Sequence, residues 1–136
     1  MHQTEVARFV PATPPVLERS LTPERIVTAE GSFEVLDIED EDGVTFVTAG
    51  ARGLQLVLRF ERTDQGWSYE QEGGAGPFDE MWTLLSWEAE NEGARVTATS
   101  GVSLGLPLSA ISDRVAAWKR RGELQRLLNE LAAEFD

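Results

Sequence analysis

The chain has 136 residues, and a domain of this length buries roughly two thirds of the surface that its unfolded form exposes, so a core can stabilise it without cross-links. The sequence contains no cysteine, which excludes disulfides, thiolate metal sites and a thiol nucleophile. It has 24 acidic and 12 basic residues, a formal net charge of -12, and this argues against nucleic-acid binding, which needs a basic surface.

The first third of the chain predicts an edge strand followed by two short helices. Residues 4–10 alternate loosely in hydropathy and end at Pro11, as an edge strand does. Pro14 and Pro15 stand where a helix can begin. A second helix starts at Thr22, whose hydroxyl can cap it, with Pro23 in its first turn.

From Ser32 onward the apolar residues recur with a period of two, which predicts six consecutive antiparallel strands. Asp42-Gly43 is the clearest turn signal, because Asp-Gly readily adopts the positive backbone angles of a tight hairpin. The residues expected to share the buried face are Leu54, Leu56, Leu58 and Phe60, then Trp67, Tyr69 and Gln71, then Met81, Thr83, Leu85 and Trp87, and finally Val96, Ala98, Ser100 and Val102. Gly105-Leu106-Pro107 then ends the last strand.

A long helix is predicted for Ser109–Phe135. Its apolar residues, which mostly recur at steps of three or four, are Ile111, Val115, Trp118, Leu124, Leu128, Leu131 and Phe135. At about 1.5 Å per residue this helix is roughly 40 Å long, enough to cross a whole sheet. The sequence therefore predicts an α+β domain over residues 1–136, in which a seven-stranded antiparallel sheet curls around the C-terminal helix and two short helices lie between strands 1 and 2.

This order of elements carries a family resemblance. Together with SFEVLDIEDEDG, LRFERTDQGWSYEQ, Gly76-Pro77-Phe78, the GARVT strand and the VSLGLP run, it resembles the START-like superfamily, also called SRPBCC or helix-grip. Within it, the chain is most similar to the polyketide cyclase/dehydrase and coenzyme Q-binding branch. The resemblance implies an apolar cavity between sheet and terminal helix that binds a lipid, a quinone or a polyketide-like molecule, and no cofactor.

The candidate binding site is the space between sheet and helix. Its expected lining is Leu56, Leu58, Tyr69, Gln71, Leu85, Trp87, Ala98 and Ser100 from the sheet, faced by Ile111, Val115 and Trp118 from the helix. Large and small residues with a few polar groups suit a mostly apolar pocket. The alternative is a solid core, because protein interiors pack with few voids.

Signals for catalysis are weak. The single histidine, His2, lies near the chain start, where we expect a frayed end, and no nucleophile stands beside a base. Tyr69, the only tyrosine, could polarise a substrate or make one structural hydrogen bond. No carboxylate is predicted to point inward. Carriage of a hydrophobic molecule is therefore favoured over a cyclase or dehydratase, and a protein-interaction module with a filled core is the third alternative, its protein partner unknown.

Three further motifs have a structural and a functional interpretation. The acidic run Glu39–Asp42 is expected to be a solvated turn rather than a metal site. The loop Gly73–Pro77 is expected at the cavity rim, since a strand rather than a helix follows it. Lys119-Arg120-Arg121 is expected on the solvated helix face, paired with Glu123 or Glu130, or else binding an anionic headgroup.

Charge and hydropathy also predict where the protein works. Lys119 is the only lysine, and an acidic surface almost without lysine suits a protein that must stay dissolved in concentrated salt. An ordinary acidic protein, or one with a basic partner, is the alternative. No basic start precedes an apolar run and no stretch is long enough to span a bilayer, so a cytoplasmic location is predicted.

Overall fold

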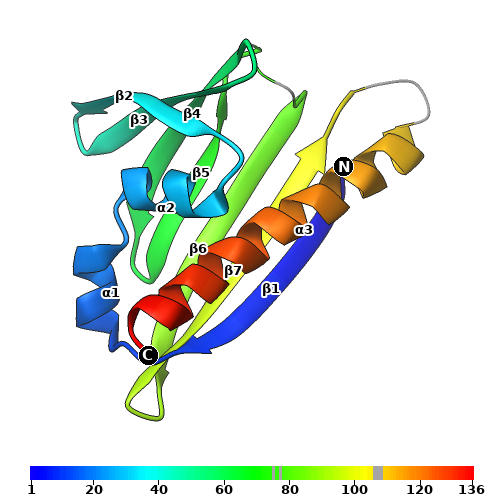
Figure 1. Cartoon of the computed structure of the whole chain (residues 1–136). Coiled ribbons are helices and arrows are strands. Elements are labelled where there is room, and N and C mark those ends of the chain that lie inside the picture. The colour runs from blue at the N-terminus through cyan, green and yellow to red at the C-terminus, as the bar shows by residue number, and fades with distance from the viewer. Residues whose placement is uncertain (75, 77, 106–108) are drawn as a thin grey trace.

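Seven antiparallel strands form one sheet in the computed structural model, which describes residues 1–74, 76, 78–105 and 109–136 (Figure 1). The elements are β1 (His2–Val10), α1 (Pro14–Ser20), α2 (Pro23–Glu30), β2 (Glu34–Glu41), β3 (Val44–Ala51), β4 (Leu54–Thr63), β5 (Gly66–Glu72), β6 (Glu80–Glu90), β7 (Gly93–Ser103) and α3 (Ser109–Glu134). The sheet order is β1-β7-β6-β5-β4-β3-β2, so β2 to β7 are sequential neighbours and β1 adds to β7. The predicted α+β helix-grip arrangement is confirmed.

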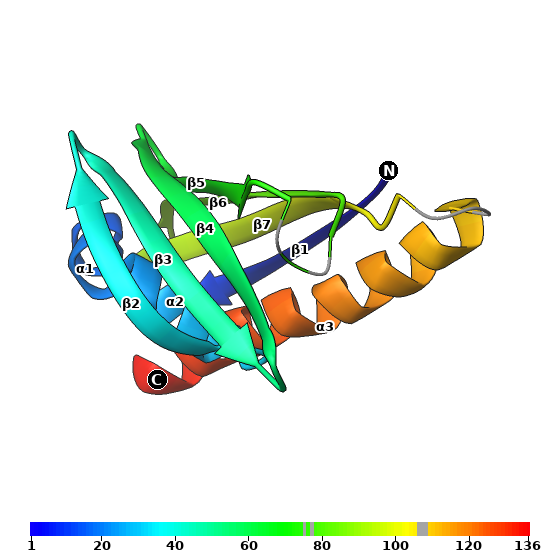
Figure 2. The ribbon, with the colours of Figure 1, turned by 90° about the horizontal axis from the view of Figure 1, so that it is seen from above.

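A tight turn sets the register of β2 and β3 at one edge of the sheet. Asp42 and Gly43 have φ of 48° and 84°, as the Asp-Gly signal predicted, and they place Glu41 opposite Val44. Such left-handed pairs match the right-handed twist of the flanking strands. The twist accumulates across the sheet, and Figure 2 shows β2, β3 and β4 curling away from β1, β7 and β6.

The two short helices begin where their sequence predicts. α1 starts at Pro14, and the hydroxyl of Thr22 accepts a hydrogen bond from the N–H of Arg25 at the start of α2. α2 ends at Gly31, whose φ of 84° stops the helix and turns the chain toward β2. α2 therefore packs against α3 and the edge of the sheet.

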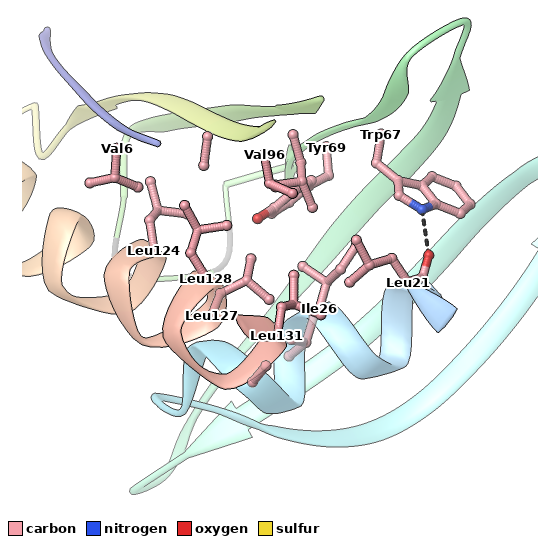
Figure 3. Packing of buried hydrophobic residues seen from close by; sticks show 14 of the residues in the cluster. Val6, Leu21, Ile26, Trp67, Tyr69, Val96, Leu124, Leu127, Leu128 and Leu131 are labelled. Carbon is pink, nitrogen blue, oxygen red and sulfur yellow. Dashed lines mark hydrogen bonds between the residues drawn. The ribbon is translucent and has the colours of Figure 1, made fainter. Parts of the chain in front are cut away.

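The core fills the concave side of the sheet (Figure 3). Leu124, Leu127, Leu128 and Leu131 of α3 are all buried there. Trp67 closes one end, because its indole N–H donates to the carbonyl of Leu21 at 2.7 Å. Each fully buried side chain of this size stabilises the fold by about 1.5–3 kcal/mol.

The predicted apolar face of α3 is wrong in its first half. Ile111, Val115 and Trp118 are 68%, 62% and 77% exposed and do not pack against the sheet. Trp118 and Leu124 are six residues apart, and at about 100° per residue this step rotates by roughly 240°, so the two halves of the pattern lie on different faces. The face that Leu124 and Leu131 share continues backward through Arg120, Ala117 and Asp113, all of them buried.

The N-terminal residues differ from the prediction. The chain start is not frayed: β1 begins at His2, and the amino group of Met1 lies 3.3 Å from Asp113. The break at Gly105-Leu106-Pro107 and the rim loop Gly73–Pro77 lie partly outside the described residues. Among the helices that are described, none is both long and apolar enough to cross a bilayer.

Candidate ligand-binding site

The eight sheet residues predicted to line a cavity lie on the concave side, and seven of them form part of the buried core. Leu56, Leu58, Tyr69, Leu85, Trp87, Ala98 and Ser100 are each at most 4% exposed. Tyr69 stacks on Phe60 with ring centroids 4.3 Å apart and an interplanar angle of 10°. Side chains therefore occupy the space directly between the middle of the sheet and α3.

Gln71 is the eighth of these residues, and it is half-buried. Its amide N–H donates to the carbonyl of Phe78 at 2.7 Å, and its amide oxygen accepts from the N–H of Phe78 at 3.4 Å. Both amide groups are thus used to fix the segment that precedes β6. Gln71 positions Phe78 rather than offering a free polar group to a ligand.

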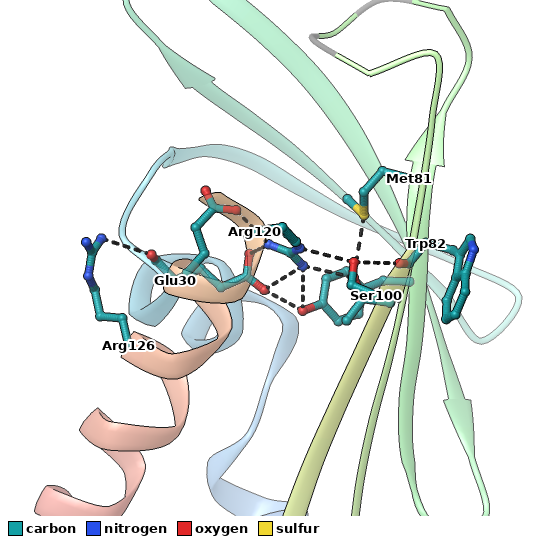
Figure 4. A network of polar contacts seen from close by, with 9 residues as sticks. Glu30, Met81, Trp82, Ser100, Arg120 and Arg126 are labelled. Carbon is teal, nitrogen blue, oxygen red and sulfur yellow. Dashed lines mark hydrogen bonds and ion pairs between the residues drawn. The ribbon is translucent and has the colours of Figure 1, made fainter. Parts of the chain in front are cut away.

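A buried cluster of polar side chains surrounds Arg120 of α3 (Figure 4). Arg120 is 3% exposed and forms two hydrogen bonds to Glu30, at 2.7 and 3.2 Å, and one to Glu123 at 3.2 Å. Glu30 comes from the last turn of α2, and its backbone carbonyl accepts from Arg126 at 3.1 Å. The cluster therefore links α2 to α3 through charges removed from water.

The other hydrogen-bond partners of Arg120 belong to the sheet. Its guanidinium donates to Thr83 at 2.9 Å, Tyr69 at 3.2 Å and Ser100 at 3.3 Å. Thr83 and Ser100 also contact each other at 3.0 Å, and the Tyr69 hydroxyl donates to Glu30. Every donor direction of the guanidinium is used, and among the described residues no buried side-chain polar atom lacks a partner.

Burial and charge shift the pKa values of this cluster. Burial, together with the negative charge of Glu30, holds the pKa of Tyr69 well above its usual value. Burial alone would lower the pKa of Arg120, but Glu30, Tyr69 and Glu123 outweigh it and raise that pKa well above its ordinary value. At neutral pH Tyr69 is a neutral donor and Arg120 a fixed cation.

An open pocket of about 640 Å³ lies beside this cluster, between the β3–β4 turn and the first half of α3. Its described apolar lining is Phe33, Ala51, Leu54, Phe78, Leu104, Val115 and Ala116, and its charged lining is Arg52, Lys119, Arg120 and Glu123. The volume falls in the usual range for small-molecule sites, and a largely apolar wall with a few charged groups is typical of them.

Of the predicted lining, only Val115 contributes to this pocket. Trp118 lies in an adjoining depression of about 340 Å³, which shares Ser32, Lys119 and Glu123 with the pocket. Ile111 lines neither of the two. The pocket is thus displaced from the predicted position, from the middle of the sheet to the end of the domain where α3 is exposed.

Sequence reasoning missed Glu30 and Arg120 as buried residues. The expectation that no carboxylate points inward is wrong, since Glu30 is 6% exposed. The predicted pairing of Arg120 with Glu123 is confirmed, but its place on a solvated face is not. The available signal was the spacing of Arg120 from Leu124, Leu127 and Leu131, which puts it on their helix face.

Asp113 of α3 binds the backbone of Leu104, the residue after β7. The N–H of Leu104 donates to its carboxylate at 2.8 Å, and the amino group of Met1 lies on its other oxygen. The Leu104 hydrogen bond and this amino group lower the pKa of Asp113, against the effect of burial. Leu104 lines the pocket, so this contact shapes one of its walls.

The acidic turn shows no sign of a metal site in the described part of the chain. Residues 39–42 are exposed, and Asp40 accepts a hydrogen bond from the hydroxyl of Thr45 at 2.6 Å. No group of three or more potential ligands converges among the described histidines and carboxylates. The exposure agrees with a solvated segment, but only Asp42 lies in the turn, because Glu39–Glu41 belong to β2.

Comparison with known proteins identifies the fold. No protein-family model and no curated protein matches the sequence. Among solved structures, the protein TTHA0849 from Thermus thermophilus aligns with a TM-score of 0.70 and 19% identity over 99% of this chain and 100% of that one. A START superfamily protein from Mycobacterium smegmatis aligns over 100% of both chains, with a TM-score of 0.66 and 10% identity.

A third similar structure is the di-domain ARO/CYC protein BexL of the BE-7585A biosynthetic pathway. It aligns with a TM-score of 0.60 and 22% identity over 93% of this chain but 45% of its own length. The chain therefore has a START-like, helix-grip fold, as the sequence resemblance implied.

Proposed function

We propose that the chain binds a hydrophobic small molecule, such as a lipid, quinone or polyketide-like compound, in the pocket between the β3–β4 turn and α3. The observation that carries this proposal is the 640 Å³ pocket, with Phe33, Phe78 and Leu104 on its wall. Among the described residues, every buried side-chain polar atom already has a hydrogen-bond partner within the protein. An apolar ligand would therefore leave no buried charge unpaired in the pocket. The START-like fold supports the same function.

Native mass spectrometry of protein from its own source, followed by organic extraction, tests this proposal. We expect a bound hydrophobic molecule at near one per chain. The purified protein should also bind a neutral apolar dye such as N-phenyl-1-naphthylamine, which becomes fluorescent when it leaves water.

A blocking variant ties the signal to this pocket. Ala51→Trp places an indole in the pocket wall, and we expect it to abolish dye binding. Ala133→Trp, at an exposed position of α3 away from the pocket, is the matched control and should bind as the wild type does. Val115→Trp narrows the pocket from the helix side, should Ala51→Trp unfold. Equal binding by all folded variants would contradict the proposed site.

A cyclase or dehydratase activity is the second candidate. Arg120 and Glu123 lie on both the pocket and the buried cluster, so a substrate in the pocket would touch charged groups. Against this, Arg120 already uses its donors on five protein side chains. The enzyme would be favoured if the wild-type protein turned over a substrate and Arg120→Lys abolished that turnover. The variant must still fold and bind the dye.

The interaction module with a filled core is the third candidate. It is supported by the seven buried sheet residues, which pack as core. Protein that carries no extractable ligand and binds no apolar dye would move the conclusion to this alternative.

A further inference from the structure

We infer that the ligand of this pocket is an anionic amphiphile, a hydrophobic body that carries one carboxylate, sulfate or phosphate. This inference rests on the proposed function and adds the chemical class of the headgroup. It is argued from two cations at the pocket mouth, Arg52 and Lys119, in a chain whose formal net charge is -12.

Neither of these cations is neutralised by the part of the chain that the structure describes. Within those residues, neither Arg52 nor Lys119 forms an ion pair with a carboxylate. Other basic side chains, such as Arg8 and Arg114, also form no ion pair with the described carboxylates, so what distinguishes Arg52 and Lys119 is that both line the pocket. Two such cations on one pocket create a local positive potential that attracts an anion.

Arg52 also occupies a backbone position that its residue type does not favour. It has a φ of 50° in the Arg52-Gly53 turn between β3 and β4, where Asn or Asp is preferred. The β2–β3 turn has the preferred Asp42 at the equivalent place. The turn fixes where the Arg52 side chain leaves the backbone, beside the pocket that it lines, although Glu92 in the β6–β7 turn has a comparable φ of 67°.

The remaining charged groups on the wall are occupied. Arg120 is bound by Glu30 and Glu123, so its charge is compensated inside the protein. Glu123 is committed to the same pair. An anionic headgroup would therefore meet Arg52 and Lys119, while its apolar body contacts Phe33, Phe78 and Leu104 on the wall.

The test compares ligands that differ only in the headgroup. N-phenyl-1-naphthylamine is bound to the wild-type protein, and dodecanoate, dodecanol and dodecyltrimethylammonium are titrated as competitors below their micelle concentrations. We expect dodecanoate to compete about three- to tenfold better than dodecanol, the size expected for two exposed charge pairs. This preference should shrink in molar NaCl, where the Debye length falls to about 3 Å.

The variant Arg52→Asn/Lys119→Gln removes both cations. Arg19→Gln is the control. Arg19 is exposed, forms no ion pair with the described carboxylates and lies away from the pocket. We expect the double variant to lose the preference for dodecanoate while dye and dodecanol binding change by less than about twofold. Arg52→Asn alone should raise the urea midpoint, because Asn suits the left-handed turn. Arg19→Gln should leave the preference unchanged.

The outcomes separate the two proposals. If dye and dodecanol bind but dodecanoate binds no better, or if the double variant weakens all ligands alike, the anionic headgroup is wrong and the proposed function stands. If no apolar molecule binds to the wild-type protein, the proposed function fails and this inference fails with it.

Discussion

Arg120 is the side chain on which two buried carboxylates, Glu30 and Glu123, depend. Its replacement by Met leaves both without their cation, and loss of one partner of a buried ion pair costs about 3–5 kcal/mol. We therefore expect Arg120→Met to lower the free energy of unfolding in urea by this amount. Arg25→Met removes a partly exposed pair with Glu134 and should cost less than about 1 kcal/mol.

The prediction for Arg120 fails if the two variants unfold at similar urea concentrations. A second comparison removes charge from both sides at once. Arg120→Met/Glu30→Gln should recover part of the loss, because it leaves one fewer unpaired carboxylate in the interior.

Tyr69 gives the protein a predictable response to alkaline pH. Its folded pKa is raised, so the unfolded chain loses the hydroxyl proton near pH 10 while the folded chain keeps it. The stabilisation from Tyr69 is therefore complete below about pH 10 and is lost as pH rises toward the folded pKa. We expect Tyr69→Phe to remove this alkaline decline in stability.

The measurement is direct because Tyr69 is the only tyrosine. Tyrosinate absorbance should not rise near pH 10 while the fold is intact, and should appear together with unfolding at higher pH. A titration near pH 10 in folded protein would contradict the buried donor role assigned to Tyr69.

At the scale of elements, α3 buries one face along its described length, but the large apolar residues of its first half lie on the opposite, exposed face. Leu127 is fully buried and Trp118 is 77% exposed. Leu127→Ala should cost about 2–5 kcal/mol in urea unfolding, because it opens a cavity in the core. Trp118→Ala should change stability by no more than about 0.5 kcal/mol. A large loss from Trp118→Ala would show that the first half of the helix packs against another surface.

The strands were predictable because their signals are local. Period-two patterns placed Tyr69, Thr83 and Ser100 on the concave face, and Asp42-Gly43 set the pairing of β2 with β3. Each of these signals uses fewer than a dozen adjacent residues. The order of the sheet followed from them, since short turns join sequential antiparallel strands.

Which face of α3 meets the sheet was not predictable from its apolar residues, because three of its described polar residues, Asp113, Arg120 and Glu123, are buried. Asp113 and Arg120 lie on the core face and are stabilised by Leu104, Glu30 and the sheet hydroxyls, partners that are distant in sequence. The apolar residues Ile111 and Trp118 are exposed, but in the sequence they have the spacing of residues that face a core. The predicted helix lining, Ile111, Val115 and Trp118, depended on the same choice of helix face.

At the scale of the whole molecule, charge is expected to dominate the response to salt. A formal net charge of -12 repels itself in the folded state, and added salt screens that repulsion. If the protein is adapted to concentrated salt, it should unfold or lose its cooperative transition at low ionic strength and recover in molar KCl. A melting temperature that is indifferent to salt would contradict this prediction.

The exposed acidic hairpin of β2 and β3 offers a control that separates charge from other effects of salt. Glu34, Asp37, Glu39 and Glu41 are exposed, and none is within an ion pair formed by the described residues. Their joint replacement by Gln or Asn reduces the net negative charge without touching the core. The melting temperature of this variant should stop rising at a lower KCl concentration than that of the wild type. Stabilisation by excluded solutes acts on buried surface rather than charge, so sucrose should raise the melting temperatures of both proteins alike. If the variant instead needs as much salt as the wild type, charge repulsion is not what the salt relieves.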